Sequence, residues 1–389
     1  MLDFLYQLNN IIDIKTIVKK KNNTIIIMVI IYILILIIVV FFNSERINNN
    51  KQIINKLNIF RTVKNNIINI KKKLGINTNF GFVLKHNYPI IQYLINSYGY
   101  ESILELTKYT EDIVDIFYVG NIYDAINLRK YNITKPIILM YLFDPNLVNL
   151  AEQYDIEIVI PNIEWYHLAI PYINNSIKCH LWFNSGLNKE GVNSESELLK
   201  LYNQLTKLPK IKLVGIGTKY NTSDKSFNKN KFNLLPDDIY KQHKIFQNIV
   251  SKINNSKLNI HTACTFEVDR NFKDSYFNTV RVGKLIYRNN VIKQPILDIK
   301  YYDKDACFGY YCVNTKKKYK NKIKVALISN NLKLNNNTNK DVKIYTNNNE
   351  KLKFLYYDYN PCAILIPDNV NLKIGDTLNI KYNDLYAYI

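Results

Sequence analysis

A lysine ends the first of several short apolar runs in the chain, and lysine can do covalent chemistry. Lys85 closes the run at residues 81–85 (GFVLK). An amine in a partly buried pocket has a lowered pKa, and it can then form a Schiff base with a carbonyl compound. A solvated lysine at a strand end is the plain structural alternative, and position alone leaves both open.

Other polar residues end similar runs further along the chain. They are Asn184, Lys219, His261 with the nearby Thr265, and Arg281 with Gly283. In a (β/α) barrel the C-terminal ends of all strands meet at one face, and that face carries the function. If the runs are barrel strands, these side chains are expected to share one site with Lys85.

The runs alternate with amphipathic stretches, as in α/β proteins. The expected strands are residues 81–85, 116–121, 136–142, 156–160, 178–184, 212–220, 257–264 and 276–283. Helical patterns lie between most of them, for example at 122–131 and 237–252. Eight such strands over roughly 200 residues predict a (β/α)8 TIM barrel at 78–295, with a doubly wound open sheet as the alternative.

After about residue 295 the helical patterns stop. Short β-rich runs follow at 322–328, 342–345, 352–357, 362–366 and 377–380. Asn-rich turns separate them, notably at 330–339. This pattern predicts a small all-β domain at 296–389.

An uncharged apolar stretch lies near the N-terminus, at residues 24–42. As a helix it would be roughly 28 Å long, enough for a bilayer core. Its length and the missing small-residue cleavage site predict an uncleaved single-pass transmembrane helix. A basic segment, 1–23, would precede it, and a linker, 43–77, would follow it.

The charge and the cysteines exclude some classes of protein. Lys+Arg number 52 and Asp+Glu 32, a net charge of +20, but the lysines are scattered through an Asn-, Ile- and Tyr-rich chain. This composition predicts no nucleic-acid partner. The five cysteines form no CxxC pattern and no metal-ligand spacing with the five histidines. They predict free thiols in a reducing compartment and no metal site.

Several short motifs, in the same order along the chain, resemble those of the alanine racemase family. They are residues 85–88 (KHNY, against K-x-N-x-Y with one residue missing), 125–138 (against ALRxAGI-xxPIL), 184–191 (NSGLNKEG, against DTGMxRxG), 215–220 (GIGTKY, against GxMTHF), 261–265 (HTACT, against HxANS), 280–283 (VRVG, against VRPG) and 375–376 (GD). The likeness covers about 78–380, so it includes both predicted domains.

The resemblance implies a racemase that uses pyridoxal 5'-phosphate (PLP) to interconvert L- and D-alanine, acting as a homodimer on a small amino acid, alanine or serine. Lys85 would carry PLP as an aldimine and be one catalytic acid/base, and Arg281 would face the pyridine nitrogen. The other residues implied to lie around the cofactor are Tyr88, Lys189, Lys219, His261, Thr265, Gly283 and Lys284. Of these, Thr265, Gly283, Lys284 and Tyr88 would hold the phosphate, and His261 would support that side of the pocket.

The second half of the family's site departs from the pattern. The Tyr that serves as the second acid/base falls on Phe308, so a displaced Tyr310 or Tyr311 would have to replace it. Lys189 stands in place of an Arg, and Lys219 in place of a His. The substrate-side pair would be Tyr357 and Asp358, and the chain ends at Ile389, before the family's terminal strand.

Three functions stay open. The first is a membrane-anchored racemase that uses Lys85 and a displaced Tyr. The second is a catalytically degenerate protein with the same fold, which binds PLP or serves as a binding module. The third is another PLP reaction such as decarboxylation, against which Arg281 argues because it is not acidic, or an unrelated function of the barrel. The side of the membrane is also open: flanking charges favour a cytoplasmic N-terminus, whereas PLP and reduced thiols favour a cytosolic barrel.

Overall fold

The computed structural model describes residues 24–86, 88–221, 237–273, 277–303, 306–308, 313–314, 322–331, 342–356 and 360–382. Between residues 24 and 49 it describes only two side chains, Tyr32 and Leu34. The chain divides into two compact units, Met1–Leu57 and Asn58–Ile389, and the second holds the barrel and the β domain.

The first described element is the long helix α3 (Thr24–Leu74), which corrects the prediction of a linker at 43–77. Ile59, Val63, Ile67 and Ile70 recur at helical spacing and are buried in the second unit. The Asn66 amide donates hydrogen bonds to the carbonyls of residues 286 and 288. These apolar residues stand among many Asn and Lys residues, and so the segment has the composition of a linker.

A membrane span is not found in the part of the chain with described side chains: no helix there is long and apolar enough to cross a bilayer. The side chains of residues 24–42 lie almost entirely outside that part. The transmembrane helix at 24–42 therefore stays a prediction, as does the basic segment 1–23, which lies outside the described residues.

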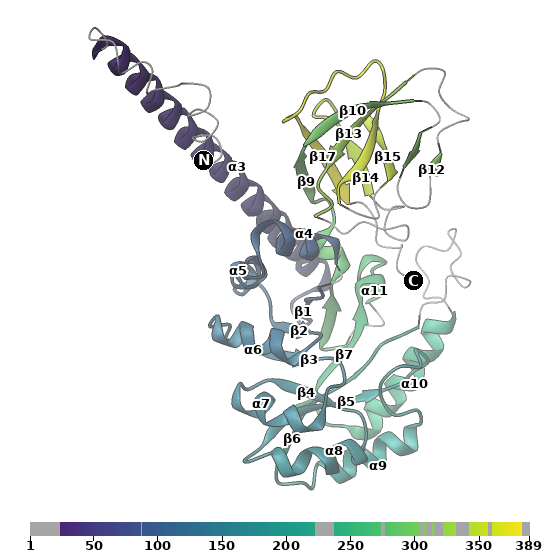
Figure 1. Ribbon diagram of the computed structural model, residues 1–389. Coiled ribbons are helices and arrows are strands. Elements are labelled where there is room, and N and C mark those ends of the chain that lie inside the picture. Colours follow the sequence, from purple (N-terminus) through teal and green to yellow (C-terminus); the bar gives the residue numbers. More distant parts are fainter. Residues whose placement is uncertain are drawn as a thin grey trace. The chain divides into compact units, whose positions relative to one another are not determined.

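Eight parallel strands close a barrel in sequence order, as the sequence predicts (Figure 1). They are β1 (Asn79–Val83), β2 (Ile116–Val119), β3 (Ile137–Leu139), β4 (Glu157–Ile160), β5 (Ile177–Phe183), β6 (Ile211–Thr218), β7 (Asn259–Cys264) and β8 (Thr279–Val282). β1 pairs with β8, with Gly81 opposite Arg281, and this pairing completes the ring. β2 and β3 are continuous apolar runs because parallel strands are covered on both faces.

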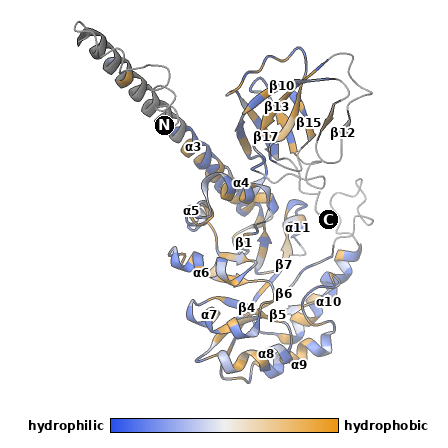
Figure 2. Cartoon of the chain, viewed as in Figure 1, coloured by the Kyte–Doolittle hydropathy of each residue, from blue (hydrophilic) through white to orange (hydrophobic). Residues whose placement is uncertain are grey.

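Helices follow the strands and cover the barrel. They are α4 (Pro89–Tyr98), α5 (Glu101–Thr110), α6 (Ile122–Lys130), α7 (Val148–Gln153), α8 (Ile163–Ala169), α9 (Glu195–Leu205), α10 (Asp237–Ile253) and α11 (Thr265–Asp269). Side chains cap the starts of three of them: Asn121, Asn162 and Ser194 each accept a backbone N–H of the first turn of α6, α8 and α9. Figure 2 shows both apolar and polar residues along α9 and α10, as expected for helices with one buried face.

The C-terminal domain is built on a seven-stranded antiparallel sheet with the order β10-β13-β16-β15-β14-β17-β9. Its strands are β9 (Val291–Pro295), β10 (Asp298–Tyr302), β13 (Ile323–Ile328), β14 (Val342–Tyr345), β15 (Lys351–Tyr356), β16 (Cys362–Ile366) and β17 (Thr377–Tyr382). A two-stranded sheet joins β11 (Cys307–Phe308) to β12 (Val313–Asn314). The all-β prediction is confirmed, but its start at residue 296 is late, since β9 already pairs with β17.

One cysteine corrects the thiol prediction. Cys307 is disulfide-bonded, whereas Cys179, Cys264 and Cys362 are free. Its strand, β11, follows the barrel and belongs to the C-terminal domain. The expectation that all the cysteines are free thiols is therefore wrong for Cys307.

Candidate functional site

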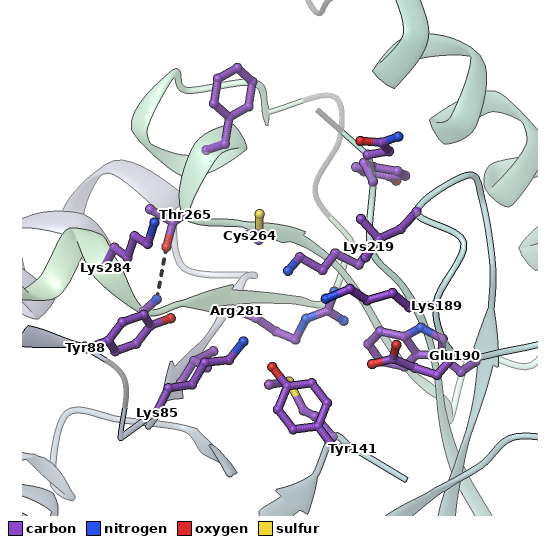
Figure 3. A pocket seen from close by; sticks show the side chains of 18 of the residues that line it. Lys85, Tyr88, Tyr141, Lys189, Glu190, Lys219, Cys264, Thr265, Arg281 and Lys284 are labelled. Carbon is purple, nitrogen blue, oxygen red and sulfur yellow. Dashed lines mark hydrogen bonds between the residues drawn. The ribbon is translucent and has the colours of Figure 1, made fainter. Parts of the chain in front are cut away.

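A cavity of about 430 Å³ opens at the C-terminal ends of the barrel strands. Its polar lining comes from β1, β3, β5, β6, β7 and β8 or the residues that follow them (Figure 3). Its lining side chains include Lys85, Tyr88, Tyr141, Trp182, Lys189, Glu190, Lys219, Thr265, Arg281 and Lys284. Of the strand-end residues that the sequence singled out, the cavity is lined by Lys85, Lys219, Thr265, Arg281 and Gly283, and not by Asn184 or His261.

Lys85 lies two residues beyond the end of β1, and its amine enters the cavity (Figure 3). Burial lowers its pKa, and the positive charges of Lys189 and Arg281 lower it further. The amine lies 5.0 Å from the centre of the Tyr141 ring. A larger share of this amine is therefore neutral near pH 7 than in a solvated lysine, and a neutral amine is nucleophilic and basic.

Thr265 and Gly283 form a cradle beside Lys85. The Gly283 N–H donates to the Thr265 hydroxyl at 3.1 Å, the dashed line in Figure 3. The Tyr88 phenol lies so close to Gly283 that a Cβ on this glycine would be 2.8 Å from its Cζ atom. Lys284 lines the same part of the cavity. Hydroxyl, phenol and amine donors around a residue without a side chain suit a phosphate group.

Arg281 lies in the floor of the cavity and is buried. Its guanidinium donates to the carbonyl oxygens of Thr218, His261 and Thr262, and lies 2.5 Å from His261 Nδ1. It also stacks 4.8 Å from the centre of the Trp182 ring. Burial lowers the pKa of Arg281, yet arginine stays charged in proteins because its ordinary value is so high. The floor therefore presents a fixed positive donor.

Two more amines, those of Lys189 and Lys219, enter the cavity from the side of β5 and β6 (Figure 3). The loop before Lys189 is ordered by Asn184, whose Oδ1 accepts the N–H groups of Gly186 and Asn188. Within the described part of the chain, neither amine forms an ion pair with a carboxylate. The cavity is therefore strongly positive and suits an anionic ligand.

Comparison with known proteins assigns the family. A family model described as "Alanine racemase, N-terminal domain" matches residues 61–290, more than half of the chain. The chain belongs to the alanine racemase family. It is 30% identical to the alanine racemase of Streptococcus agalactiae over 197 residues, covering 50% of this chain and 51% of that protein. It is 26% identical to alanine racemase 1 of Bacillus subtilis over 227 residues, covering 58% and 54%. The chain thus spans about half the length of these relatives.

Solved structures of alanine racemases share the fold over a longer stretch. A Bacillus anthracis alanine racemase with bound L-Ala-P superposes with a TM-score of 0.64 at 18% identity, covering 82% of this chain and 83% of that chain. A histidine racemase from Leuconostoc mesenteroides gives 0.63 at 16% identity, covering 82% and 86%. At these identities the likeness concerns the fold, a parallel barrel followed by an antiparallel β domain.

The alanine racemase cofactor, PLP, fits the residues that are present. The fit rests on the buried amine of Lys85, the phosphate-type donors around Gly283, and the guanidinium of Arg281. A cavity of about 430 Å³ also falls in the usual range for cofactor sites. Lys85 would link the cofactor, Thr265, Tyr88 and Lys284 would hold its phosphate, and Arg281 would face its ring.

His261 is the residue of the predicted site that the structure places differently. It does not line the cavity but is buried beneath Arg281, with its ring against the guanidinium. His261 lies within β7 and points into the barrel interior, so it supports Arg281 rather than the phosphate side. Phe308 is buried in the core of the β domain, and the centre of its ring lies 5.1 Å from the centre of the Tyr302 ring.

Some predicted residues fall outside the described part of the chain, and some lining residues were not predicted. The first group is Tyr310, Tyr311, Tyr357 and Asp358. The second includes Tyr141, Trp182, Glu190 and Tyr220. Tyr141 lies at the end of the run 136–142, so the strand-end rule could have found it. Glu190 and Tyr220 lie within the motif segments 184–191 and 215–220, but the resemblance gave them no role. Trp182 lies in the expected strand 178–184, outside every motif.

The buried state of His261 gives a pH prediction. Burial lowers its pKa well below 6.5, and Arg281 and His180 lower it further. Near pH 6.5 and below, the unfolded chain therefore binds a proton at His261 that the folded chain does not bind. The free energy of unfolding falls as the pH drops below that value. The contribution approaches about 1.4 kcal/mol per pH unit. Urea unfolding at pH 7, 6 and 5 should show a shallower loss for His261→Gln than for the wild type. If the free energy of unfolding fell equally with pH in the two proteins, the lowered pKa of His261 would be contradicted.

Proposed function

We propose that the protein is a PLP-dependent racemase of a small amino acid, alanine or serine. The observation that carries the proposal is the meeting of Lys85, Arg281 and the Thr265–Gly283 cradle in one cavity. When bound, PLP supplies the electron sink that makes the Cα proton of an amino acid removable. The histidine racemase that shares the fold indicates that this architecture serves more than one substrate.

The chain's own residues have distinct tasks in this proposal. The Lys85 amine holds the cofactor, and it takes or returns a proton at the substrate Cα on one face. Its lowered pKa suits this because a base works best when its pKa is close to the operating pH. Arg281 can only donate, so it favours an unprotonated ring nitrogen. Thr265, Tyr88 and Lys284 orient the phosphate and so fix the ring between Lys85 and Arg281.

The test of the function is a chiral assay on the full-length chain. Purified protein with added PLP is incubated with L-alanine, and separately with L-serine, and both enantiomers are quantified by chiral chromatography. We expect both to approach an equal mixture of enantiomers. PLP binding without any racemisation of either would support the degenerate alternative. Formation of an amine with loss of CO₂ would support decarboxylation.

Racemisation also requires an acid/base on the other face of the substrate Cα. Tyr310 and Tyr311, the positions that the sequence favours, stay candidates outside the described residues. Lys219 is a candidate within them, because its amine enters the cavity opposite Lys85 in Figure 3. It could exchange a proton from that side.

Solvent exchange distinguishes these candidates. In D₂O, the variant that lacks the second acid/base should still exchange the Cα proton of one alanine enantiomer while racemisation falls by about 10²–10⁴-fold. We expect this pattern for Lys219→Ala, measured by mass spectrometry of both enantiomers beside Tyr310→Phe and Tyr311→Phe. The same pattern in a tyrosine variant instead would exclude Lys219.

The resemblance also implies a homodimer, and this remains part of the proposal. Light scattering coupled to size-exclusion chromatography of the detergent-solubilised full chain measures it directly. We expect a mass of two chains after subtraction of the detergent. A monomer that racemises alanine would show that one chain holds the whole site.

The single-pass membrane anchor at 24–42 is the last part of the proposal. The lysines before residue 24 favour a cytoplasmic N-terminus. The disulfide at Cys307 favours an oxidising compartment for the barrel, and the two arguments agree. Carbonate extraction of membranes should leave the protein in the pellet, and protease added outside intact cells should cleave the barrel domain. Release by carbonate would contradict the anchor.

A further inference from the structure

A chain of polar side chains, buried except for the partly buried Glu157 at its end, leads from the cavity floor to the opposite end of the barrel. Arg281 Nη1 lies 2.5 Å from His261 Nδ1. His261 Nε2 lies 3.0 Å from His180 Nδ1, and His180 Nε2 lies 2.8 Å from a Glu157 oxygen. The two histidines are fully buried. Glu157 is the first residue of β4, so it lies at the amino end of the barrel, away from the cavity.

The donors and acceptors in this chain can be arranged in only one way. Arginine has no acceptor, so His261 Nδ1 must accept from Arg281. The proton of His261 is then on Nε2, which donates to His180 Nδ1. The proton of His180 is in turn on Nε2, which donates to the carboxylate of Glu157. Both rings are therefore neutral and share one tautomer, and the hydrogen bonds run from Arg281 to Glu157.

The barrel makes room for both rings with glycines. Gly215 and Gly217 are two residues apart in β6, so they face the same side of the strand. A Cβ on Gly217 would lie 2.7 Å from His261 Nδ1, and a Cβ on Gly215 would collide with the His180 ring. The two rings meet edge to face, with their centres 4.9 Å apart. Any other residue at either glycine would displace one of the two histidines.

We propose that Glu157 and His180 are positioning residues that hold Arg281 in its orientation at the cavity floor. Without the acceptor at Glu157, the His180 proton can move to Nδ1 and donate to His261 Nε2. His261 must then carry its proton on Nδ1, facing an N–H of Arg281, and that contact becomes repulsive. A group at the far end of the barrel thus determines whether Arg281 keeps its place. The consequence for PLP rests on the proposed function, whereas the tautomers do not.

The test reads the tautomers and cofactor binding separately. Full-length protein labelled with ¹⁵N-histidine is studied by solid-state NMR without PLP, and the five histidines are assigned by substitution. We expect His180 and His261 to be neutral with the proton on Nε2. In Glu157→Leu we expect the proton to move to Nδ1 in a measurable fraction of both rings, and PLP to bind about tenfold more weakly, the effect of losing one hydrogen bond to a charged group.

Two further variants, one at Glu157 and one control, complete the test. Glu157→Gln keeps an oxygen acceptor but removes the charge. Because a neutral acceptor preserves the direction of the hydrogen bonds, both histidines should keep their proton on Nε2. The affinity for PLP should stay within about twofold of the wild type. Glu164→Leu, on the exposed face of α8, is the control and should change neither. Three results would each overturn the proposal. The first is a proton on Nδ1 of either histidine in the wild type, and the second is unchanged tautomers in Glu157→Leu. The third is a tenfold loss of PLP affinity in Glu157→Gln. If Glu157→Leu does not fold, the wild-type spectrum and Glu157→Gln decide. If no variant binds PLP, the proposed function fails and the tautomers alone decide.

Discussion

Replacing Lys85 with alanine is expected to lower alanine racemisation by about 10⁴-fold, the upper end for loss of an acid/base. The effect is large because one amine has two tasks, holding the cofactor and exchanging the Cα proton. Burial and the charges of Lys189 and Arg281 prepare this amine by lowering its pKa. The measurement is kcat on L-alanine by chiral chromatography, together with the visible absorbance of protein-bound PLP. The variant should lose both.

The control for this prediction is Lys212→Ala. Lys212 also lies on a barrel strand, but it is exposed near the start of β6, at the end away from the cavity. This variant should keep both kcat and the absorbance of bound PLP. Added methylamine should restore part of the activity of Lys85→Ala, because a small amine can enter the space that the side chain leaves. Activity of Lys85→Ala within tenfold of the wild type would show that another residue carries the chemistry.

Gly217→Ala is expected to destabilise the fold by about 1–3 kcal/mol, the usual cost of overpacking a barrel interior. Its Cβ would lie 2.7 Å from His261 Nδ1 and 2.9 Å from Trp182 Cζ3. Both neighbours are rings packed against Arg281, so neither can move away without disturbing the guanidinium. Urea unfolding measures the stability, and PLP titration should show weaker binding in the same variant.

Gly120→Ala is the matched control for that change. A Cβ on Gly120 would meet only the Tyr141 ring, at 3.3 Å, so a small movement of this ring accommodates it. We expect it to cost less than about 1 kcal/mol. If the two glycine variants were equally stable, the barrel interior around His261 would be looser than the contacts indicate.

The barrel could be predicted from the sequence because its strands are buried on both faces. Some, such as β2 and β3, appear as short continuous apolar runs, and a polar residue within or just after the last strand residues marks the strand end. Lys85, Lys219 and Arg281 were found in this way, and the structure places all three in one cavity. Tyr141 obeys the same rule, two residues beyond the end of β3, but the motif at 125–138 ends before it.

Other features depend on contacts that a single sequence does not show. The helical part of 43–77 has its apolar residues spread among Asn and Lys, and only packing against the barrel reveals the buried face. His261 was expected beside the phosphate because it precedes Thr265 in a motif. The side-chain alternation of β7 instead turns it into the barrel interior, where it meets Arg281 and His180. Glu157 carries no local signal, since its partner is 23 residues away.

The most direct test of the central claim is to locate the bound cofactor chemically. Full-length protein incubated with PLP is reduced with borohydride, which fixes the cofactor to the amine that holds it, and is then digested and analysed by mass spectrometry. We predict one modified peptide, with the reduced pyridoxyl phosphate on Lys85, and no modification at Lys189, Lys219 or Lys284. Modification of one of those three lysines instead, or of none, would contradict the account of this cavity as a PLP site built on Lys85.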